Sequence, residues 1–258
     1  MKTATARNPS TPSAAWTLVL ASLGVFMTAL DTLVVTTALP VMRVDLGASL
    51  SDLEWTVNAY NLAFACSLLT GAAIGDRFGR RRMFTVGLSV FTAASAAAAL
   101  SSTVSELILC RAVQGTGAAI VMPPTLTLIS EAFPAAKRGA AIGLWGGITG
   151  LAVATGPVVG GAVVSGMDWH WIFWLNVPVG IVLIPLAASR LTESFGPRQR
   201  LDIAGLLLAG AGALGLTWGL AAIAAGTALS SLVAPTALVL ASGTAFALSE
   251  LADFAVYT

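Results

Sequence analysis

Long runs of apolar residues, separated by short charged segments, are the dominant pattern of this chain. Each run exceeds the roughly 18 residues that a helix needs to cross a membrane. Backbone N–H and C=O groups in lipid must be paired within their own segment, so every run is predicted to be helical. The runs are Trp16–Pro40, Trp55–Gly75, Met83–Ser105, Leu107–Ser130, Gly139–Met167, Trp171–Ser189, Ile203–Ala225 and Leu229–Ser249. We therefore predict an all-α membrane protein in which each run is one span.

The positions of the basic residues predict the topology. If the N-terminus is cytoplasmic, Arg43 is the one basic residue in the outer segments, and Arg111 lies inside a span. Every other Lys and Arg then falls on the inner side, as the positive-inside rule requires. Tryptophans near the predicted span ends, Trp169 among them, are typical of anchors at the membrane surface. We predict a multi-pass protein of the cell (plasma or inner) membrane.

The composition supports this class of protein. Hydrophobic residues make up 57% of the chain and charged residues only 10%, whereas soluble domains contain about 25% charged residues. We expect no nucleic-acid partner. Two cysteines, Cys66 and Cys110, and the single His170 give no disulfide framework and no metal-ligand spacing. No Asp, His, Cys or Ser pair has catalytic spacing, so we expect no metal, no cofactor and no enzymatic activity.

Asp31 and Arg111 are the two charged residues inside the predicted spans. If the helices end where the runs end, Asp31 lies about 13 Å and Arg111 about 6–8 Å below the outer surface. Charges at membrane depth are costly and face a partner or a water-filled cavity. One interpretation is a static ion pair between two helices. The other is a proton site in a water-accessible crevice, because burial disfavours the charged carboxylate whereas a nearby guanidinium favours it.

The residues that follow Arg111 indicate a polar helix face. Arg111, Gln114, Gly115 and Ala118 recur at the spacing of one face of a helix. The two small residues leave room beside the two polar side chains. This face is predicted to form part of a cavity wall.

The run Gly139–Met167 is rich in glycine. Pairs spaced by four residues, such as Gly156 and Gly160, allow neighbouring helices to pack closely. Pro157 removes a backbone N–H and favours a kink. The pattern is compatible with simple helix packing, or with a bend that lets one helix bundle rock against another.

Five short segments carry a more specific signal. They are Ala72–Arg81 (AAIGDRFGRR), Arg111–Gly115 (RAVQG), Gly156–Gly161 (GPVVGG), Leu30–Thr32 with Ala38–Pro40, and Trp169–Pro178 (WHWIFWLNVP). Together they resemble signatures of the major facilitator superfamily, in particular of its fourteen-helix drug–proton antiporters. The resemblance covers about residues 16–190. Thr36 stands where that pattern usually has asparagine, and His170 where arginine is common.

The resemblance implies a fold and a domain organisation. Residues 16–189 would form the N-terminal six-helix bundle of the superfamily, built from two three-helix inverted repeats. A cytoplasmic tail, 1–15, would precede it. A cytoplasmic linker, 190–202, and two further transmembrane helices within 203–258 would follow. The second six-helix half of the family is absent from the sequence, so we expect an N-terminal fragment.

The resemblance also implies a function, a proton-coupled efflux antiporter of drugs or other small amphipathic molecules. Its partners would be the proton, a small-molecule substrate, membrane lipid and a second transporter half. Three alternatives stay open. These are a non-transporting membrane fragment, a half-transporter that needs a partner chain, and a facilitator for a polar solute.

Each motif receives an expected role. Asp31 would accept the proton and Arg111 would modulate it. The substrate cavity would include Thr36, Asn58, Gln114 and Gly115. The antiporter bend would consist of Gly156, Pro157, Gly160 and Gly161. The cytoplasmic gating loop would consist of Asp76, Arg77, Gly79, Arg80 and Arg81.

Overall fold

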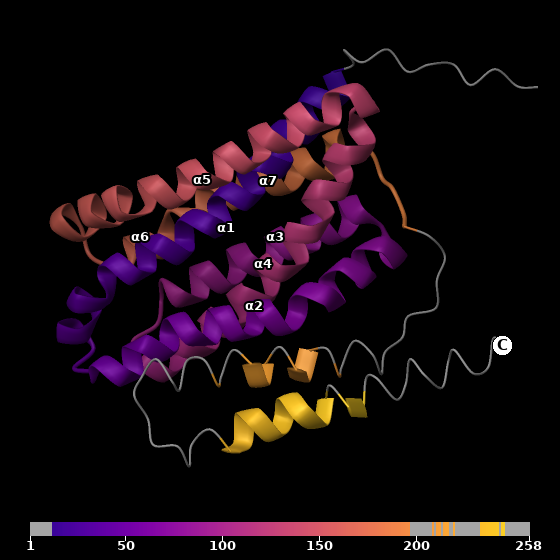
Figure 1. The fold of residues 1–258 in the computed structure, drawn as a ribbon. Helices are drawn as coiled ribbons and strands as arrows, with labels where there is room; N and C mark the ends of the chain where they lie inside the picture. Colours follow the sequence, from indigo (N-terminus) through magenta and orange to yellow (C-terminus); the bar gives the residue numbers. More distant parts are fainter. Residues whose placement is uncertain are drawn as a thin grey trace, which may run out of the picture.

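A bundle of long helices makes up most of the described chain (Figure 1). The computed structural model describes residues 12–196 and positions 208, 210–212, 214–216, 219, 233–242 and 244–245. The helices are α1 (Pro12–Asp45), α2 (Leu50–Phe78), α3 (Arg80–Ala98), α4 (Val104–Ala132), α5 (Ala135–Gly166), α6 (Trp171–Trp174) and α7 (Asn176–Arg190). α6 and α7 follow one another as a single apolar span. The predicted all-α membrane fold is confirmed.

Several helices end elsewhere than the apolar runs do. α1 continues through Pro40 to Asp45, so Asp31 lies about 21 Å from the outer end of its helix. The run Met83–Ser105 is too long, because α3 ends at Ala98. An apolar run shows which residues can contact lipid. The backbone hydrogen bonds of a helix can continue well beyond the ends of that run.

A capping box sets the start of α4. The Thr103 hydroxyl accepts a hydrogen bond from the backbone N–H of Glu106 (3.3 Å), and the Glu106 carboxylate accepts one from the N–H of Thr103 (3.2 Å). The helix therefore begins at Val104, and Arg111 lies about 10 Å from its start. Asp31 and Arg111 therefore lie further from the ends of their helices than the apolar runs imply.

The packing of the helices shows the two predicted repeats (Figure 1). α1 lies against α5, α2 against α4, and α3 against both α4 and α7. One repeat consists of α1, α2 and α3, and the other of α4, α5 and α7, in corresponding order. Under this correspondence the α1–α5 contact matches the α4–α2 contact. The α3–α4 contact likewise matches the α7–α1 contact, which is formed as well. Two three-helix repeats related by symmetry require this correspondence.

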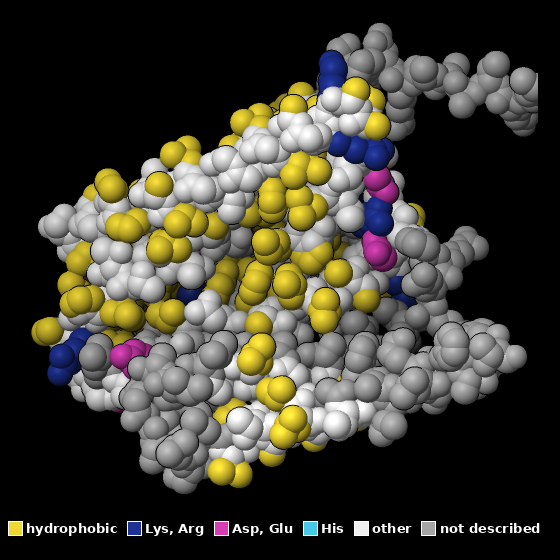
Figure 2. Space-filling model, viewed as in Figure 1, with side chains coloured by type: hydrophobic (Ala, Val, Ile, Leu, Met, Phe, Trp, Pro, Cys, Tyr) yellow, Lys and Arg dark blue, Asp and Glu magenta, His cyan; other side chains and the backbone are white. Residues whose placement is uncertain are grey.

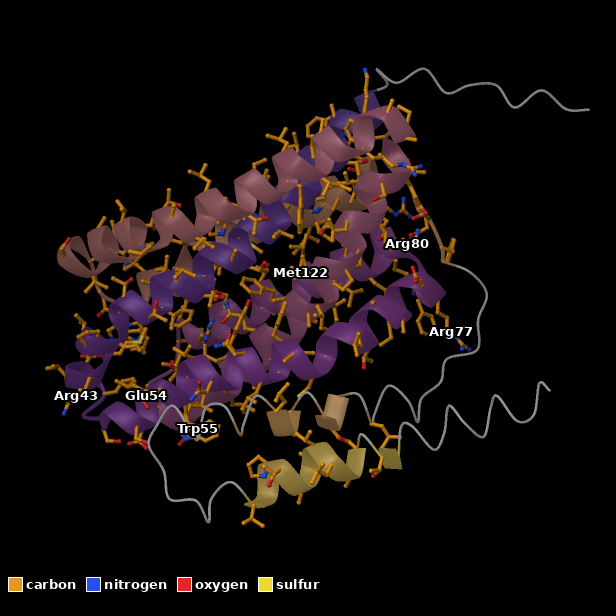
Figure 3. All side chains as sticks on the ribbon, in the orientation of Figure 1. Arg43, Glu54, Trp55, Arg77, Arg80 and Met122 are labelled. Atoms are coloured by element: carbon orange, nitrogen blue, oxygen red, sulfur yellow. The ribbon has the colours of Figure 1, made fainter. Side chains whose placement is uncertain are left out.

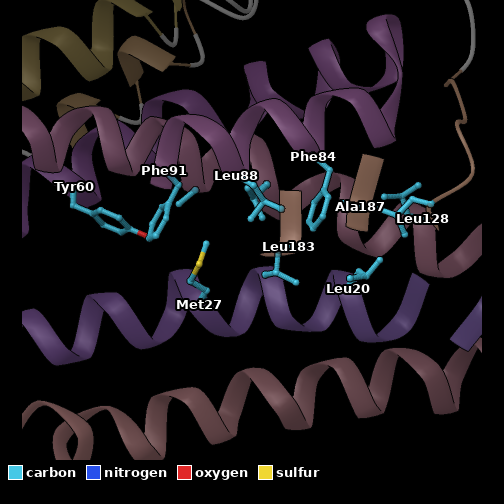
Figure 4. Close-up of a cluster of buried hydrophobic side chains, with 12 residues drawn as sticks. Leu20, Met27, Tyr60, Phe84, Leu88, Phe91, Leu128, Leu183 and Ala187 are labelled. Atoms are coloured by element: carbon cyan, nitrogen blue, oxygen red, sulfur yellow. The ribbon is translucent and has the colours of Figure 1, made fainter. Parts of the chain in front are cut away.

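A cluster of buried apolar side chains joins the helices (Figure 4). Phe84, Leu88 and Phe91 are fully buried on α3, at the spacing of one helix face. Leu183 and Ala187 of α7 belong to the same cluster. Burial of a large apolar side chain stabilises a packed structure by about 1.5–3 kcal/mol in water, but lipid is itself apolar, so close packing provides the contact energy here.

Trp169 belongs to a second buried cluster, with Ile172 and Phe173, and does not anchor the chain in the membrane surface. Its side chain is 1% exposed. The indole Nε1 donates a hydrogen bond to Oδ2 of Asp45 (2.8 Å), and the ring stacks on His170. The interfacial role predicted for Trp169 is therefore wrong.

Charged side chains gather at the ends of the bundle, and apolar side chains cover its long sides (Figure 2). Arg77 and Arg80 lie at one end, and Arg43 and Glu54 at the other (Figure 3). Most of the last two predicted spans, together with tail residues 1–11, lies outside the described residues. The described part of the final span includes a short apolar helix, Val233–Ser242.

Candidate functional site

Asp31 and Arg111 meet in the interior of the bundle. Asp31 projects from the middle of α1, and Arg111 from the third turn of α4. Arg111 Nη1 lies 2.5 Å from Asp31 Oδ2, and the two side chains are 0% and 1% exposed. Burial of an ion pair is favourable only when further hydrogen bonds satisfy both groups. The surroundings of each group therefore decide what this pair can do.

Two amides complete the surroundings of the carboxylate. Gln114 Nε2 donates to Asp31 Oδ1 (3.0 Å), and Asn176 Nδ2 donates to the same oxygen (2.7 Å). Gln114 also accepts a hydrogen bond from Arg111 Nη1 through its Oε1 (2.8 Å). Asp31 is thus bonded to donors from α4 and from α7. This set of donors matches an ionised carboxylate, which accepts hydrogen bonds and donates none.

The guanidinium of Arg111 lies against aromatic rings. Its Cζ is 4.2 Å from the ring centre of Tyr60 and 6.0 Å from that of Phe173, distances at which a cation is attracted to the ring face. Nε donates to the backbone oxygen of Thr56 (3.3 Å). Nη2 is buried and has no hydrogen-bond partner among the described residues. The arginine therefore keeps one donor free within a closed site.

Asn176 is the first residue of α7, directly after the one-residue interruption at Leu175. Pro178 has no backbone N–H to bond to the carbonyl four residues earlier, that of Trp174. At this break Ser95 of α3 donates to the backbone oxygen of Phe173 (2.9 Å) and accepts from Asn176 Nδ2 (3.0 Å). The break thus connects α3, α7 and the carboxylate of α1.

The residues expected to line a substrate cavity do not share one open space. Gln114 is buried in the Asp31 network. Gly115 packs against α2, where an added Cβ would overlap the backbone oxygen of Tyr60. Thr36 is exposed on α1, and its hydroxyl donates to Leu33 O (2.7 Å). Asn58 is half-buried on α2. The polar helix face around Arg111 is therefore closed in this structure.

The glycines of α5 fall into two groups. Gly156 lies against Leu33 of α1, and Gly160 lies against Thr37, whose Cβ would be 3.0 Å from an added methyl carbon. By contrast, Gly161 has no described neighbour within 4 Å of such a carbon. The same holds for Gly139, Gly143, Gly146, Gly147 and Gly150. α5 runs without interruption through Pro157.

The charged loop between α2 and α3 forms its own network. Arg80 Nε donates to Asp76 Oδ1 (2.8 Å), and its Nη1 pairs with Glu131 at the end of α4. Gly79 adopts a φ of 105°, a region that favours glycine. Arg77 is exposed beside the ring of Phe78. The loop therefore fixes the ends of α2, α3 and α4 relative to one another.

Glu193, which follows α7, caps the start of α3. Its Oε1 accepts from the backbone N–H of Arg81 (3.0 Å) and its Oε2 from that of Arg82 (3.2 Å), while Arg80 N donates to Ser194 O (2.9 Å). The N-cap residue Gly79 has no side chain to do this, so a carboxylate distant in sequence satisfies the free N–H groups. Gly196 N also donates to Asp76 O (2.9 Å).

The opposite end of the bundle carries one more charged contact. The pKa of the Asp168 carboxyl lies below its usual value because the backbone N–H of His170 donates to Oδ1 (2.9 Å) and the imidazole Nδ1 contacts the same oxygen. This contact holds the turn that leads into α6.

The family model of the Major Facilitator Superfamily matches residues 21–189. The chain belongs to this superfamily. The tetracenomycin C resistance and export protein of Streptomyces glaucescens is 39% identical over 206 residues, which are 79% of this chain and 38% of that protein. The cephamycin export protein CmcT of Amycolatopsis lactamdurans is 39% identical over 228 residues, which are 83% of this chain and 45% of that protein. This superfamily chain thus spans less than half the length of these relatives.

A solved structure shows the same fold. The peptide transporter POT in complex with sulfate superposes with a TM-score of 0.59, at 17% sequence identity. The match covers 67% of this superfamily member and 37% of the peptide transporter. At this identity the likeness concerns the arrangement of the helices alone.

The close packing of Gly115 against α2 leads to a prediction about the stability of the bundle. Gly115→Ala forces α2 and α4 apart, so we expect the free energy of unfolding to fall by about 1–3 kcal/mol. The matched control is Gly147→Ala on α5, where no described atom lies within 4 Å of the new carbon and alanine favours the helix. Thermal unfolding in detergent measures both. Equal stability of the two variants would contradict the close contact.

The Glu193 cap leads to a second prediction. Glu193→Ala leaves the N–H groups of Arg81 and Arg82 without their acceptor, and loss of an N-cap costs about 1 kcal/mol. We expect faster hydrogen exchange at these two amides, with the rest of α3 unchanged. Glu54→Ala, an exposed acidic residue at the opposite end, is the control. Unchanged exchange at the start of α3 would remove Glu193 as its cap.

Proposed function

We propose that this bundle binds and releases the coupling proton of an antiporter that exports drugs or other small amphipathic molecules. The observation that carries the proposal is the buried contact between Asp31 and Arg111, at the junction of α1, α4 and α7. A carboxylate held by one guanidinium and two amides connects three helices through a single titratable group. Protonation of this group alters three helix contacts at once.

The proposed step is a change of partners around Asp31. The ionised carboxylate accepts from Arg111, Gln114 and Asn176 in the closed arrangement. Protonation removes its negative charge, while the guanidinium remains charged at any pH that the cell experiences. Arg111 then turns toward other acceptors, and α1 is released from α4 and α7. Loss of the proton to the cytoplasm restores the closed arrangement.

The proton gradient supplies the energy of export. Each charge that crosses a potential of 100 mV is worth about 2.3 kcal/mol. In this scheme the end with Arg77 and Arg80 faces the cytoplasm and the N-terminus is cytoplasmic, because almost all basic residues lie on that side. The loop residues Asp76, Arg77, Gly79, Arg80 and Arg81 act as the cytoplasmic gate. Their network of ion pairs holds the inner ends of α2, α3 and α4 together.

Export requires a second helix bundle in this proposal. Thr36 and the glycines of α5 without described neighbours lie on a face that a second six-helix half would cover, with the substrate between the two halves. Gly156, Pro157, Gly160 and Gly161 allow α5 to move along α1. The relatives named for tetracenomycin C and cephamycin export support a small-molecule substrate. Their greater length leaves room for that second half.

Two measurements test the proposal. Infrared difference spectra of the chain in lipid, recorded during a pH titration, should contain the protonation signal of a buried carboxyl group. Vesicles that contain the chain and trapped ethidium, a cationic amphipathic dye, then report export driven by a pH gradient, alone and with a second half from a relative added. Export that stops with a protonophore supports the antiporter.

Each alternative gives a different result. Flux that persists without a gradient indicates a facilitator. Flux that appears only with the second half is the result that the proposal expects of a half-transporter, and flux by the chain alone would contradict the need for a second bundle. Absence of both the carboxyl signal and the flux indicates a static ion pair in a non-transporting bundle, and it would refute the proposed function.

A further inference from the structure

A groove lies between α3 and α7 at the end of the bundle that contains the charged loop. Its volume is about 440 Å³. Arg81, Arg82 and Glu193 line its charged end, and the rest is lined by Val86, Val90 and Ala188 together with Thr85 and Ser89. The groove is separate from the Asp31 network, since none of its lining residues contributes to that network. Of its lining residues, the proposed function uses only Arg81, in the cytoplasmic gate.

The charges at this end of the groove leave an unbalanced cation. Both oxygens of Glu193 accept backbone hydrogen bonds, and one of them also pairs with Arg81 Nε (3.5 Å). Arg81 Nη1 donates to Leu191 O (3.4 Å). The guanidinium of Arg82 is exposed and has no carboxylate partner among the described residues. An anion with several oxygens could therefore bind Arg82 and the remaining donors of Arg81 without displacing Glu193.

Away from its charged end, the groove continues into a mainly apolar surface. Val86 is 40% exposed on α3, and Val90 lies one turn further along the same face. Ile181 is 63% exposed on α7 and lies two turns before Ala188, so it extends that side of the groove toward the membrane centre. The hydroxyls of Thr85 and Ser89 donate to backbone oxygens of α3, so a ligand held at the arginines would contact mainly apolar groups over the rest of its length.

We propose that this groove binds an anionic phospholipid. The phosphate contacts Arg82 and Arg81, and an acyl chain lies along Val86, Val90 and Ile181. Arginine binds phosphate oxygens through several N–H groups at once, and basic pockets between transmembrane helices on the inner side of the membrane bind anionic head groups. The bound lipid bridges α3 and α7 beside the Glu193 cap. It therefore stabilises the junction between these two helices.

The experiment uses the purified 258-residue chain in a neutral detergent. Native mass spectrometry measures the binding of phosphatidylglycerol, of zwitterionic phosphatidylcholine with the same acyl chains, and of inorganic phosphate. We expect phosphatidylglycerol to bind most strongly and to raise the unfolding temperature, because a ligand of the folded state stabilises it. Arg82→Gln should weaken its binding roughly fivefold, since one arginine near an anionic lipid contributes about 1 kcal/mol.

Two further variants make the result decisive. Ala188→Trp fills the groove without changing a charge and should also weaken phosphatidylglycerol binding. Arg43→Gln removes an exposed arginine at the opposite end and should leave binding unchanged. The proposal is overturned if Arg82→Gln and Ala188→Trp, folded as judged by circular dichroism, bind phosphatidylglycerol as the parent does. Equal binding of the two lipids, or equally strong binding of phosphate alone, would overturn it as well.

Discussion

Replacing Asp31 by asparagine is expected to abolish the carboxyl protonation signal and proton-driven export. Asparagine has nearly the same shape but does not titrate. Its NH2 group replaces one carboxylate oxygen and faces a donor in either orientation, either Arg111 or the amides of Gln114 and Asn176, so the closed arrangement weakens as well. Infrared titration of the chain measures the first effect, and ethidium flux with an added second half measures the second.

Asp45→Asn is the matched control for this experiment. Asp45 is an exposed carboxylate on the same helix and accepts from Trp169 outside the network. That variant should keep both the signal and the flux. Normal proton-driven export by the Asp31→Asn variant would remove Asp31 from the coupling mechanism, and a carboxyl signal that persists would assign the proton to another residue.

The sequence was sufficient to predict the pairing at the centre of the bundle. A charge in a membrane span needs a partner, and the chain offers one acid and one base within its first six spans. No such argument from the sequence identifies Asn176 or Ser95 as members of the same network. Both are small polar residues within apolar runs, and such residues most often bond to their own helix. The position of Asn176 two residues before Pro178 was the available clue, because a proline interrupts the ladder next to it.

Contacts between segments distant in sequence were equally hard to predict. Glu193 caps α3 from beyond the end of α7, and no local pattern connects a lone glutamate with an N-terminus more than a hundred residues away. The arginines of the same loop suggested only a topology signal and a gate. The capping box of Thr103 and Glu106 was different, since its residue types and spacing are visible in the sequence. It would have given the correct start of α4.

The glycine pattern illustrates the same limit. Spacings of four residues recur along α5, yet only Gly156 and Gly160 approach α1 closely among those described in that helix. Periodicity identifies a face that allows close contact, and the three-dimensional arrangement decides which part of it is used. The unused part is the surface that the proposed second half would cover.

Replacing Arg111 by methionine should have the largest effect on stability. The substitution leaves Asp31, whose side chain is 1% exposed, with two amide donors and no countercharge. Breaking a buried ion pair by removal of one partner costs about 3–5 kcal/mol. We expect a loss of that size in the free energy of unfolding, measured by thermal or denaturant unfolding in detergent. Arg43→Met, which removes an exposed arginine, should change the stability little.

The double variant Asp31→Leu with Arg111→Met separates the pair from the rest of the network. Apolar replacement of both partners of a buried ion pair is often neutral or stabilising, so the double variant should recover most of the stability that Arg111→Met loses. In this variant Gln114 loses both of its partners, Asp31 and Arg111, whereas Asn176 keeps its bond to Ser95. A small residual loss of stability then measures the cost of the unpaired amide. If the double variant is as unstable as the single one, the contact between Asp31 and Arg111 is not the source of the loss. A stable double variant that no longer exports would show that the bundle retains this costly pair for coupling, since packing alone is satisfied without it.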